Sequence, residues 1–145
     1  MDFDSSMKIS ASGLTANRTW INVLSSNLAN ANTTKTADGG PYARKTVIYE
    51  SKETGGFSEQ LSAAMGEGAE KVQVTDIVPD KRDFREVYDP GHPDADANGV
   101  VRMPNINPVE EMANLINASR SYEANLAALQ TAKQLAIKAI DIGSK

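Results

Sequence analysis

Two long stripes of apolar residues, one at each end of the chain, constrain the fold more than any other feature. The N-terminal stripe recurs every seven residues at Met7, Leu14, Ile21 and Leu28. The intervening three-four positions of the same face hold Ser10, Asn17, Leu24 and Ala31. The C-terminal stripe follows a three-four spacing at Met112, Leu115, Tyr122, Leu126, Leu129 and Ile140, with Ser119, Lys133 and Ala136 on the same face. Neither stripe can bury itself alone, so the spacing predicts two amphipathic helices that pair as a coiled coil.

The apolar content is small for a self-sufficient core. Aromatic residues make up 6% of the 145 residues, and much of the 40% hydrophobic fraction is alanine, which buries little surface per residue. An ordinary helical hairpin packed on its own core would carry similar stripes. Helical patterns longer than ~25 residues are nevertheless more typical of coiled coils and arrays than of compact domains. We therefore expect the stripes to contact neighbouring molecules as well.

The chain divides into an N-terminal helix (residues 1–35), an extended middle segment (36–106) and a C-terminal helix (107–145), within one structural domain. Asp4 or Ser5 is expected to cap the first helix, which should end near Asn30, where short polar side chains compete with helical hydrogen bonds. The last helix should begin with Asn107 as its cap and Pro108 at its first position, and stop at Gly143.

The middle segment shows strand patterns. Residues 42–50 mix aromatic and β-branched side chains with charges, and residues 71–78 alternate and are expected to pair with residues 84–88 as a hairpin. Residues 100–103 add an extended piece, and the glycine-rich residues 54–69 predict a flexible loop. The predicted fold class is mainly α with a small β element, in which long terminal helices pair around an irregular middle with a short β-hairpin.

Motifs for chemistry are nearly absent. Residues 94–99 open like an EF-hand loop, but the twelfth position is Asn105 where a bidentate glutamate is required. His92 is the only histidine and there is no cysteine, so a metal site of the zinc type has no ligand set. An acidic hydrolytic site in the middle segment stays open as an alternative, because carboxylate pairs are defined by distance. We therefore expect that the protein is not an enzyme and that it binds no metal and no cofactor.

Charge and hydropathy argue against a nucleic-acid-binding protein and against a membrane-spanning one. The net charge is −4 and the middle segment is acidic, so the chain lacks the basic surface that binds nucleic acid. No apolar run approaches the ~18 residues of a membrane span, and the first residues lack the pattern of a cleaved secretory signal. Export, if it occurs, is expected to use another route.

Four strings resemble the flagellar basal-body rod and hook family, whose members are axial proteins. They are LSSNLANANTTKT at residues 24–36, GGPYARK at 39–45, VYDPGHPDADANGVVRMPNINPVEEM at 87–112 and SYEANLAALQTAKQLAIKAIDIG at 121–143. The third string is similar to that of proximal rod proteins in particular. Within the first string, the resemblance marks Asn27, Asn30, Asn32 and Thr33 as family-motif residues that shape the exit from the first helix.

The resemblance implies a structural subunit of the proximal rod, located within the periplasm, that self-assembles through its terminal helices into a torque-transmitting helical tube. It also implies export without a cleaved signal through the flagellar type III apparatus. The implied partners are other copies and other rod proteins, extending to membrane-ring and export-gate proteins, with no nucleic acid and no small-molecule substrate. The expected assembly interface is Leu14, Ile21, Leu24, Leu28, Met112, Leu115, Tyr122, Leu126, Leu129 and Ile140. The alternative is a soluble helical adaptor or export chaperone that binds a partner's amphipathic helix.

Overall fold

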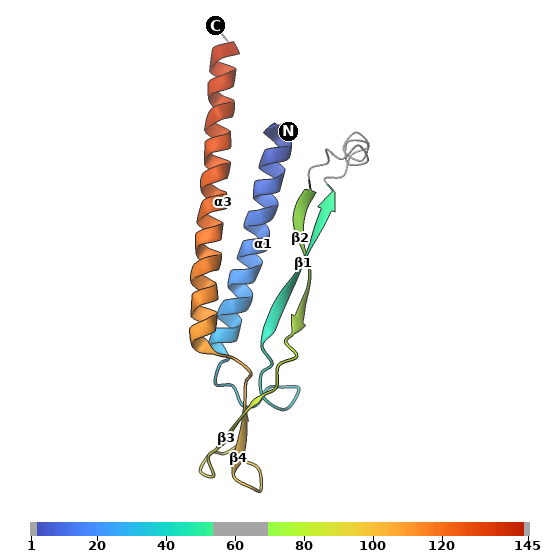
Figure 1. Ribbon diagram of the computed structural model, residues 1–145, viewed down its shortest axis with the longest axis vertical. Helices are drawn as coiled ribbons and strands as arrows, with labels where there is room; N and C mark the ends of the chain where they lie inside the picture. The colour runs from blue at the N-terminus through green and yellow to red at the C-terminus, as the bar shows by residue number, and fades with distance from the viewer. Residues whose placement is uncertain (1–2, 54–69, 144–145) are drawn as a thin grey trace.

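The computed structural model describes residues 3–53 and 70–143, which form two long helices and two small β-hairpins (Figure 1). Helix α1 spans Phe3–Ala29 and helix α3 spans Pro108–Gly143. The two helices lie side by side and run in opposite directions, with the C-terminal end of α3 extending past the N-terminal end of α1. This arrangement confirms the predicted fold class. The predicted flexible loop at 54–69 lies outside the described residues.

The ends of the helices follow from local hydrogen bonding. The Asn107 side chain accepts a hydrogen bond from the Val109 amide at 3.1 Å, so Asn107 caps α3 as expected. At the end of α1, the Asn30 side chain donates to the Ser26 carbonyl and accepts from the Thr33 hydroxyl. The expected cap of α1 is wrong, because the helix already begins at Phe3 and Asp4 and Ser5 lie within it.

Strand pairing differs from the prediction. Strand β1 (Lys45–Glu53) pairs antiparallel with β2 (Glu70–Pro79), and β3 (Arg85–Tyr88) pairs antiparallel with β4 (Val100–Met103). The expected hairpin between residues 71–78 and 84–88 is therefore wrong. The chain after β2 does not turn back, because the Asp80 amide donates to the Arg44 carbonyl at 2.7 Å and the Asn105 side chain donates to the Arg82 carbonyl at 2.8 Å.

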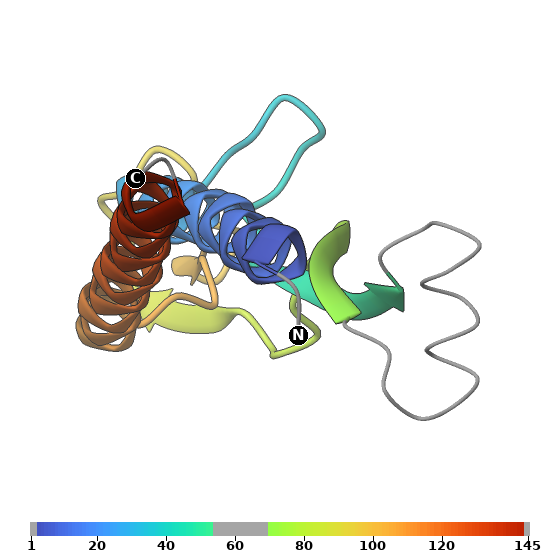
Figure 2. The same cartoon turned by 90° about the horizontal axis from the view of Figure 1, so that it is seen from above.

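Helix α1 is the central element. Figures 1 and 2 show it between α3 on one side and the β1–β2 hairpin on the other, and α3 packs against no other helix or strand of the described chain. The Ser12 hydroxyl accepts a hydrogen bond from the Val72 amide at 3.2 Å, which ties the edge of β2 to α1. The buried apolar residues are few and mostly small: Ala16, Val23, Leu24, Ala31, Val47, Val101, Ile106 and Ala118.

Two contacts define the axial alignment of the helices. Asn27 of α1 bonds Glu111 of α3, and a Cβ placed on Gly13 would lie 3.0 Å from the side-chain nitrogen of Asn125. Fourteen residues separate the two contacts on each helix, so both belong to one register. In this register Phe3 lies level with Leu135, and α3 continues beyond it for about 12 Å to Gly143 at 1.5 Å per residue.

Neither described helix combines the length and the hydropathy that a membrane-spanning segment requires.

Candidate functional site

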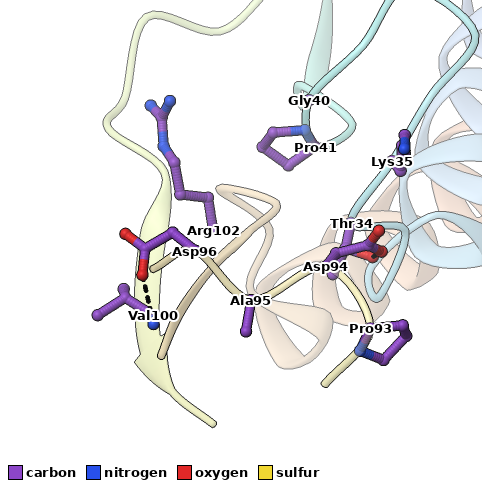
Figure 3. A pocket seen from close by; sticks show the side chains of 10 residues that line it. All are labelled: Thr34, Lys35, Gly40, Pro41, Pro93, Asp94, Ala95, Asp96, Val100 and Arg102. Carbon is purple, nitrogen blue, oxygen red and sulfur yellow. Dashed lines mark hydrogen bonds between the residues drawn. The ribbon is translucent and has the colours of Figure 1, made fainter. Parts of the chain in front are cut away.

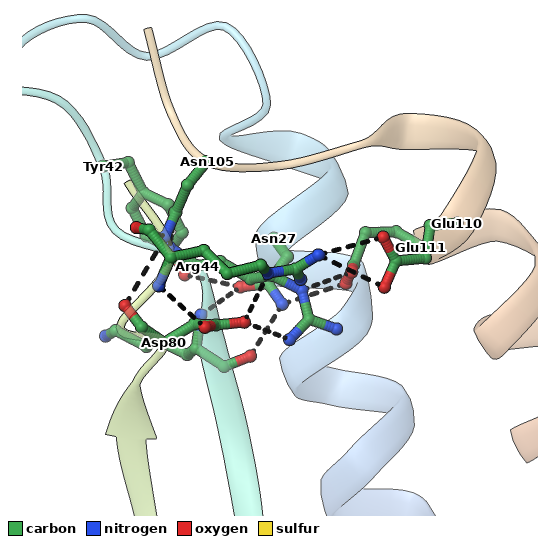
Figure 4. Close-up of polar contacts among 9 residues, drawn as sticks. Asn27, Tyr42, Arg44, Asp80, Asn105, Glu110 and Glu111 are labelled. Carbon is green, nitrogen blue, oxygen red and sulfur yellow. Dashed lines mark hydrogen bonds and ion pairs between the residues drawn. The ribbon is translucent and has the colours of Figure 1, made fainter. Parts of the chain in front are cut away.

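A cluster of polar side chains joins five segments of the chain at the end of the helix pair where α3 begins (Figure 4). Its members come from α1, from the residues just before β1, from the segment between β2 and β3, from the segment between β4 and α3, and from the first turn of α3. We call it the polar cluster, and it consists of Asn27, Tyr42, Arg44, Asp80, Arg82, Asn105, Glu110 and Glu111.

Asn27 links α1 to both β1 and α3. Its side-chain oxygen accepts from the Lys45 amide at 2.9 Å, and its side-chain nitrogen donates to the Lys45 carbonyl at 2.9 Å. The same nitrogen donates to Glu111 at 3.0 Å, and the Tyr42 hydroxyl donates to the Asn27 oxygen at 3.3 Å. Asn27 is fully buried, so these bonds replace the water that its carboxamide has lost. The side chain thus bonds the first residue of β1 much as a neighbouring strand would.

Arg44 and Glu111 form an ion pair inside the protein. The Arg44 Nε lies 2.6 Å from a Glu111 carboxylate oxygen, and the Glu111 side chain is 0% exposed. A second side-chain nitrogen of Arg44, Nη1, donates to Asp80 at 3.1 Å. A buried pair of this kind recovers its desolvation cost only when the remaining polar atoms are also bonded. Asn27 supplies that second bond, because it donates to the other oxygen of Glu111.

Asp80, Arg82 and Glu110 extend the polar cluster to the surface. Arg82 donates to Asp80 at 2.9 Å and to Glu110 at 3.1 Å, and its side chain is 46% exposed. Burial opposes ionisation of Asp80, but bonds from the Arg82 main chain and guanidinium, and from Arg44, outweigh it and hold the pKa of Asp80 below its usual value. Chiefly through its bond to Glu110, Arg82 has a pKa above its usual value.

Asn105 connects the segment before α3 to the rest of the polar cluster. Its side-chain oxygen accepts from the Arg44 amide at 2.7 Å, while its nitrogen donates to the Arg82 carbonyl at 2.8 Å. Among the described residues, no buried side-chain nitrogen or oxygen lacks a partner. The carboxylates of the polar cluster are held by arginines, so the arrangement is suited to joining segments and leaves no carboxylate placed for proton transfer.

The sequence resembling an EF-hand forms a polar turn beside a shallow cleft of about 380 Å³ (Figure 3). Asp96 accepts hydrogen bonds at 2.8 Å from the amides of Asn98 and Val100, and Asp94 accepts one from Thr34 at 2.7 Å. These carboxylates serve the turn and its contact with the loop after α1. Within residues 3–53 and 70–143, no three potential metal ligands come together.

The residues predicted for the assembly interface divide by exposure. Those buried or half-buried are Leu14, Ile21, Leu24, Leu28, Leu115, Tyr122 and Leu129. Met112, Leu126 and Ile140 are exposed, Met112 to 46% and Ile140 to 70%. The predicted C-terminal stripe is thus split between two faces of α3, and its role in assembly stays a prediction.

The face that α3 turns toward α1 is rotated from the predicted one. From Glu111 onward, the half-buried or buried positions of α3 are Glu111, Asn114, Leu115, Ala118, Ser119, Tyr122, Asn125, Leu129, Ala132 and Ala136. Glu111 and Asn125 occupy this face where Met112 and Leu126 were predicted, whereas Leu115 keeps its place. Every second position is thus displaced by one residue, so the face as a whole is rotated by about half of the ~100° between consecutive residues. The ion pair of Glu111 with Arg44 accounts for the difference, because it holds Glu111 on the inner side of α3.

A second apolar stripe on α3 is left without cover. We call it the outer stripe, and it consists of Val109, Met112, Ile116, Leu126, Ile137 and Ile140, all exposed. Its members belong to one three-four series along α3, whose other positions are Ser119, Glu123, Gln130 and Lys133. The series is displaced by about one residue, or ~100°, from the inner face. Exposed apolar patches on a protein surface often mark interaction sites.

The family-motif residues have distinct places. Asn27 is at the centre of the polar cluster, and Asn30 and Thr33 end α1, whereas Asn32 is exposed. Sequence reasoning missed the roles of Arg44 and Glu111. The available signal was that both lie within the strings that carry the family resemblance, and that Glu111 precedes Leu115 by one helical turn.

Comparison with known proteins assigns the family. Residues 7–35 match the family model for flagella basal body rod proteins, and residues 97–142 match that for the C-terminal region of flagellar basal body rod FlgEFG proteins. The chain is 43% identical over 145 residues to the flagellar basal-body rod protein FlgC of Bacillus subtilis, covering 95% of this chain and 96% of that protein. It is 41% identical over 135 residues to FlgC of Escherichia coli O6:H1, covering 93% of each.

A third relative, of lower identity, gives the same result. The chain is 38% identical over 152 residues to FlgC of Borreliella burgdorferi, with 98% of each protein covered. These matches confirm the resemblance carried by the four strings. The chain therefore belongs to the FlgC family of flagellar basal-body rod proteins, which are structural components of the rod and not enzymes.

Proposed function

We propose that this chain packs with copies of itself and with other rod proteins into a helical tube that transmits torque, and that the outer stripe of α3 is one of its packing surfaces. The observation that carries the proposal is the exposed apolar outer stripe on a helix that is covered on one side only. A second helix from a neighbouring subunit would bury this stripe by the same three-four spacing.

The end of α3 supports the same proposal. Beyond Leu135 no described residue of α1 lies opposite α3, yet this part of the helix carries Ile137, Ile140 and Ile142, which are 49%, 70% and 78% exposed. We call residues 136–143 the α3 extension. Leaving three isoleucines in water forgoes the stabilisation that burial would give, about 1.5–3 kcal/mol for each side chain.

The small core fits the proposed route to the rod. In the described part of the chain, the largest fully buried side chains are Leu24, Glu111, Val101, Asn27 and Pro104. A chain with so few buried apolar groups is easily unfolded, as passage through an export channel without a cleaved signal would require. Within this proposal the rod lies in the periplasm, and the partners extend to membrane-ring and export-gate proteins. The adaptor alternative has no support from the family to which the chain belongs.

The test places a charge on the outer stripe. Ile140→Asp, at a position 70% exposed, and Leu126→Asp should abolish incorporation into rods while leaving export largely intact, because a buried carboxylate without a partner is strongly unfavourable. Ala124→Asp is the matched control, because Ala124 is exposed on the same helix and lies outside both apolar faces. The measurements are motility, the protein content of purified basal bodies, and the circular dichroism of each purified variant.

Normal motility and normal basal-body content in cells that carry only Ile140→Asp would contradict the proposal. Loss of assembly in the Ala124→Asp control as well would show that a charge anywhere on α3 is harmful, and the outer stripe would lose its special role.

A further inference from the structure

The packing between α1 and α3 gives weak control over their axial alignment. At the level of Gly13 the contact is with Asn125, and the only fully buried apolar residue of α3 is Ala118. The larger inner-face residues, Leu115, Tyr122 and Leu129, recur every seven residues and are only half-buried. A shift of α3 by one heptad would keep the seven-residue spacing of these three side chains, so they do not by themselves specify the alignment.

The polar cluster does not tolerate such a shift. In the observed register Asn27 lies opposite Glu111 and both are fully buried. A shift of seven residues in one direction would place Glu111 opposite Trp20, away from Arg44 and Asn27. A shift in the other direction would place Asn27 opposite Ala118. Either shift leaves a buried polar or charged group without its partner, which is far costlier than the exchange of one apolar contact for another.

We propose that Asn27, Arg44 and Glu111 set the register of the terminal helices, and that the apolar faces alone do not. A single buried polar interaction is known to fix register in coiled coils at some expense in stability. Here the interaction also includes the start of β1, because Asn27 bonds both main-chain groups of Lys45. The register thus depends on three segments being in place together.

The register also sets the length of the α3 extension. A slip of one heptad would lengthen or shorten it by about 10 Å at 1.5 Å per residue. A slip that shortens it would bring both Ile137 and Ile140 level with α1, and a slip that lengthens it would leave residues 129–135 beyond α1 as well. This consequence rests on the proposed function, in which the extension contacts a neighbouring subunit, whereas the setting of the register by Asn27, Arg44 and Glu111 does not.

Engineered disulfides can measure the register because the chain has no cysteine. The native-register pair is Gly13→Cys/Asn125→Cys, since a Cβ on Gly13 would lie 3.4 Å from Asn125 Cγ. The slipped-register pairs are Gly13→Cys/Ala118→Cys and Gly13→Cys/Ala132→Cys. In the native register each slipped pair is separated by about 10 Å along the axis, too far to form a disulfide.

Each pair is oxidised in three backgrounds of the full-length chain: unaltered, Arg44→Met/Glu111→Leu, and the matched control Arg82→Met/Glu110→Leu. The control removes a neighbouring arginine–glutamate pair of which both members are exposed. Replacing both members of the buried pair by apolar residues often preserves stability, so the first variant should stay helical. The readout is the ratio of native-register to slipped-register disulfide, measured by intact mass after mild oxidation.

We expect the ratio to exceed about tenfold in the unaltered and control backgrounds, and to fall at least about fivefold in Arg44→Met/Glu111→Leu. An unchanged ratio in that variant, with native helix content, would overturn the proposal. If the variant loses its helix content, Glu111→Gln, which keeps the shape of the side chain, replaces it and is judged by the same fall in ratio. The measurement uses unassembled protein, so its outcome is independent of the basal-body test of the proposed function.

Discussion

At the scale of single residues, Glu111 differs from its neighbour Glu110 only in environment. Glu111 is buried and bonded by Arg44 and Asn27, whereas Glu110 is 42% exposed and bonded by Arg82. Removing one member of a buried ion pair typically costs 3–5 kcal/mol. We expect Glu111→Ala to lower the free energy of unfolding by about 3 kcal/mol, the lower part of that range, because Arg44 keeps its bond to Asp80.

Glu110→Ala is the matched control, and we expect it to change the free energy of unfolding by less than about 1 kcal/mol, as is usual for an exposed pair. Urea titration followed by far-ultraviolet circular dichroism measures both variants. Equal losses for the two glutamates would mean that the buried pair contributes no more than the exposed one.

Asp80 makes the free energy of unfolding depend on pH in the acidic range. Its pKa is below the usual value in the folded state, so folding favours the ionised carboxylate. The stabilisation is complete above the unfolded-state pKa of about 3.9 and is lost as pH falls through the lower, folded-state pKa. We expect the free energy of unfolding to decrease below about pH 4, and to decrease less steeply in Asp80→Asn. Urea titrations at a series of pH values would measure both slopes, and identical slopes would contradict this assignment.

The polar cluster could be predicted only in part from the sequence. Asn27 belonged to a string with a family resemblance, and its position near the end of a helix suggested a turn-forming role. Its burial could not be predicted, because a helix-ending asparagine is usually exposed. Arg44, Asp80 and Asn105 are separated by up to about sixty residues and meet only because β1, the segment after β2 and the segment before α3 converge.

At the scale of secondary-structure elements, the helices were predictable and the strand pairing was not. The cap at Asn107, the proline that follows it and the heptad spacing are local signals that each agree with α3. Strand pairing depends on which segments the rest of the fold brings together. Strands β1 and β2 are separated in sequence by residues 54–69, and no short hairpin-turn motif between them indicated that they pair.

The β3–β4 hairpin depends on Gly99. Gly99 has a φ of +75°, and a Cβ at this position would lie 3.1 Å from the ring of Tyr88 and 3.2 Å from Pro90. We expect Gly99→Ala to cost about 1–3 kcal/mol, from the left-handed backbone and the close contacts together. Gly91→Ala is the control, because its Cβ would make an ordinary contact of 3.5 Å with Asp89. Urea titration measures both, and a Gly99→Ala protein as stable as Gly91→Ala would show that the loop relaxes without cost.

At the scale of the whole molecule, α3 is packed against α1 over part of its length, and its C-terminal end extends beyond α1. Residues 115–129 of α3 lie against α1, whereas the α3 extension has no described element beside it. Isolated helical ends fray, because short helices gain most of their stability from tertiary packing. We therefore expect the helical structure of the α3 extension to be less stable than that of the part of α3 packed against α1.

Hydrogen exchange can measure this difference directly. In the unassembled protein we expect amides of residues 138–143 to exchange at least about a hundredfold faster than those of 118–129, because opening the extension disrupts no contact with α1. After assembly with other subunits, the same amides should become protected if the extension is buried between neighbours.

Comparing amide exchange before and after assembly shows whether the extension is protected by its own helical structure or by a neighbouring subunit. Slow exchange of the extension in a monomer, verified by analytical ultracentrifugation, would mean that the helix is stable without a neighbour, and its exposed isoleucines would no longer indicate a missing partner. Fast exchange before assembly and slow exchange afterwards, lost in Ile140→Asp and kept in Ala124→Asp, would mean that the extension becomes ordered on the surface of the next subunit. The outer stripe would then contribute to both the strength and the order of assembly, since each added subunit would stabilise the end that the following one contacts.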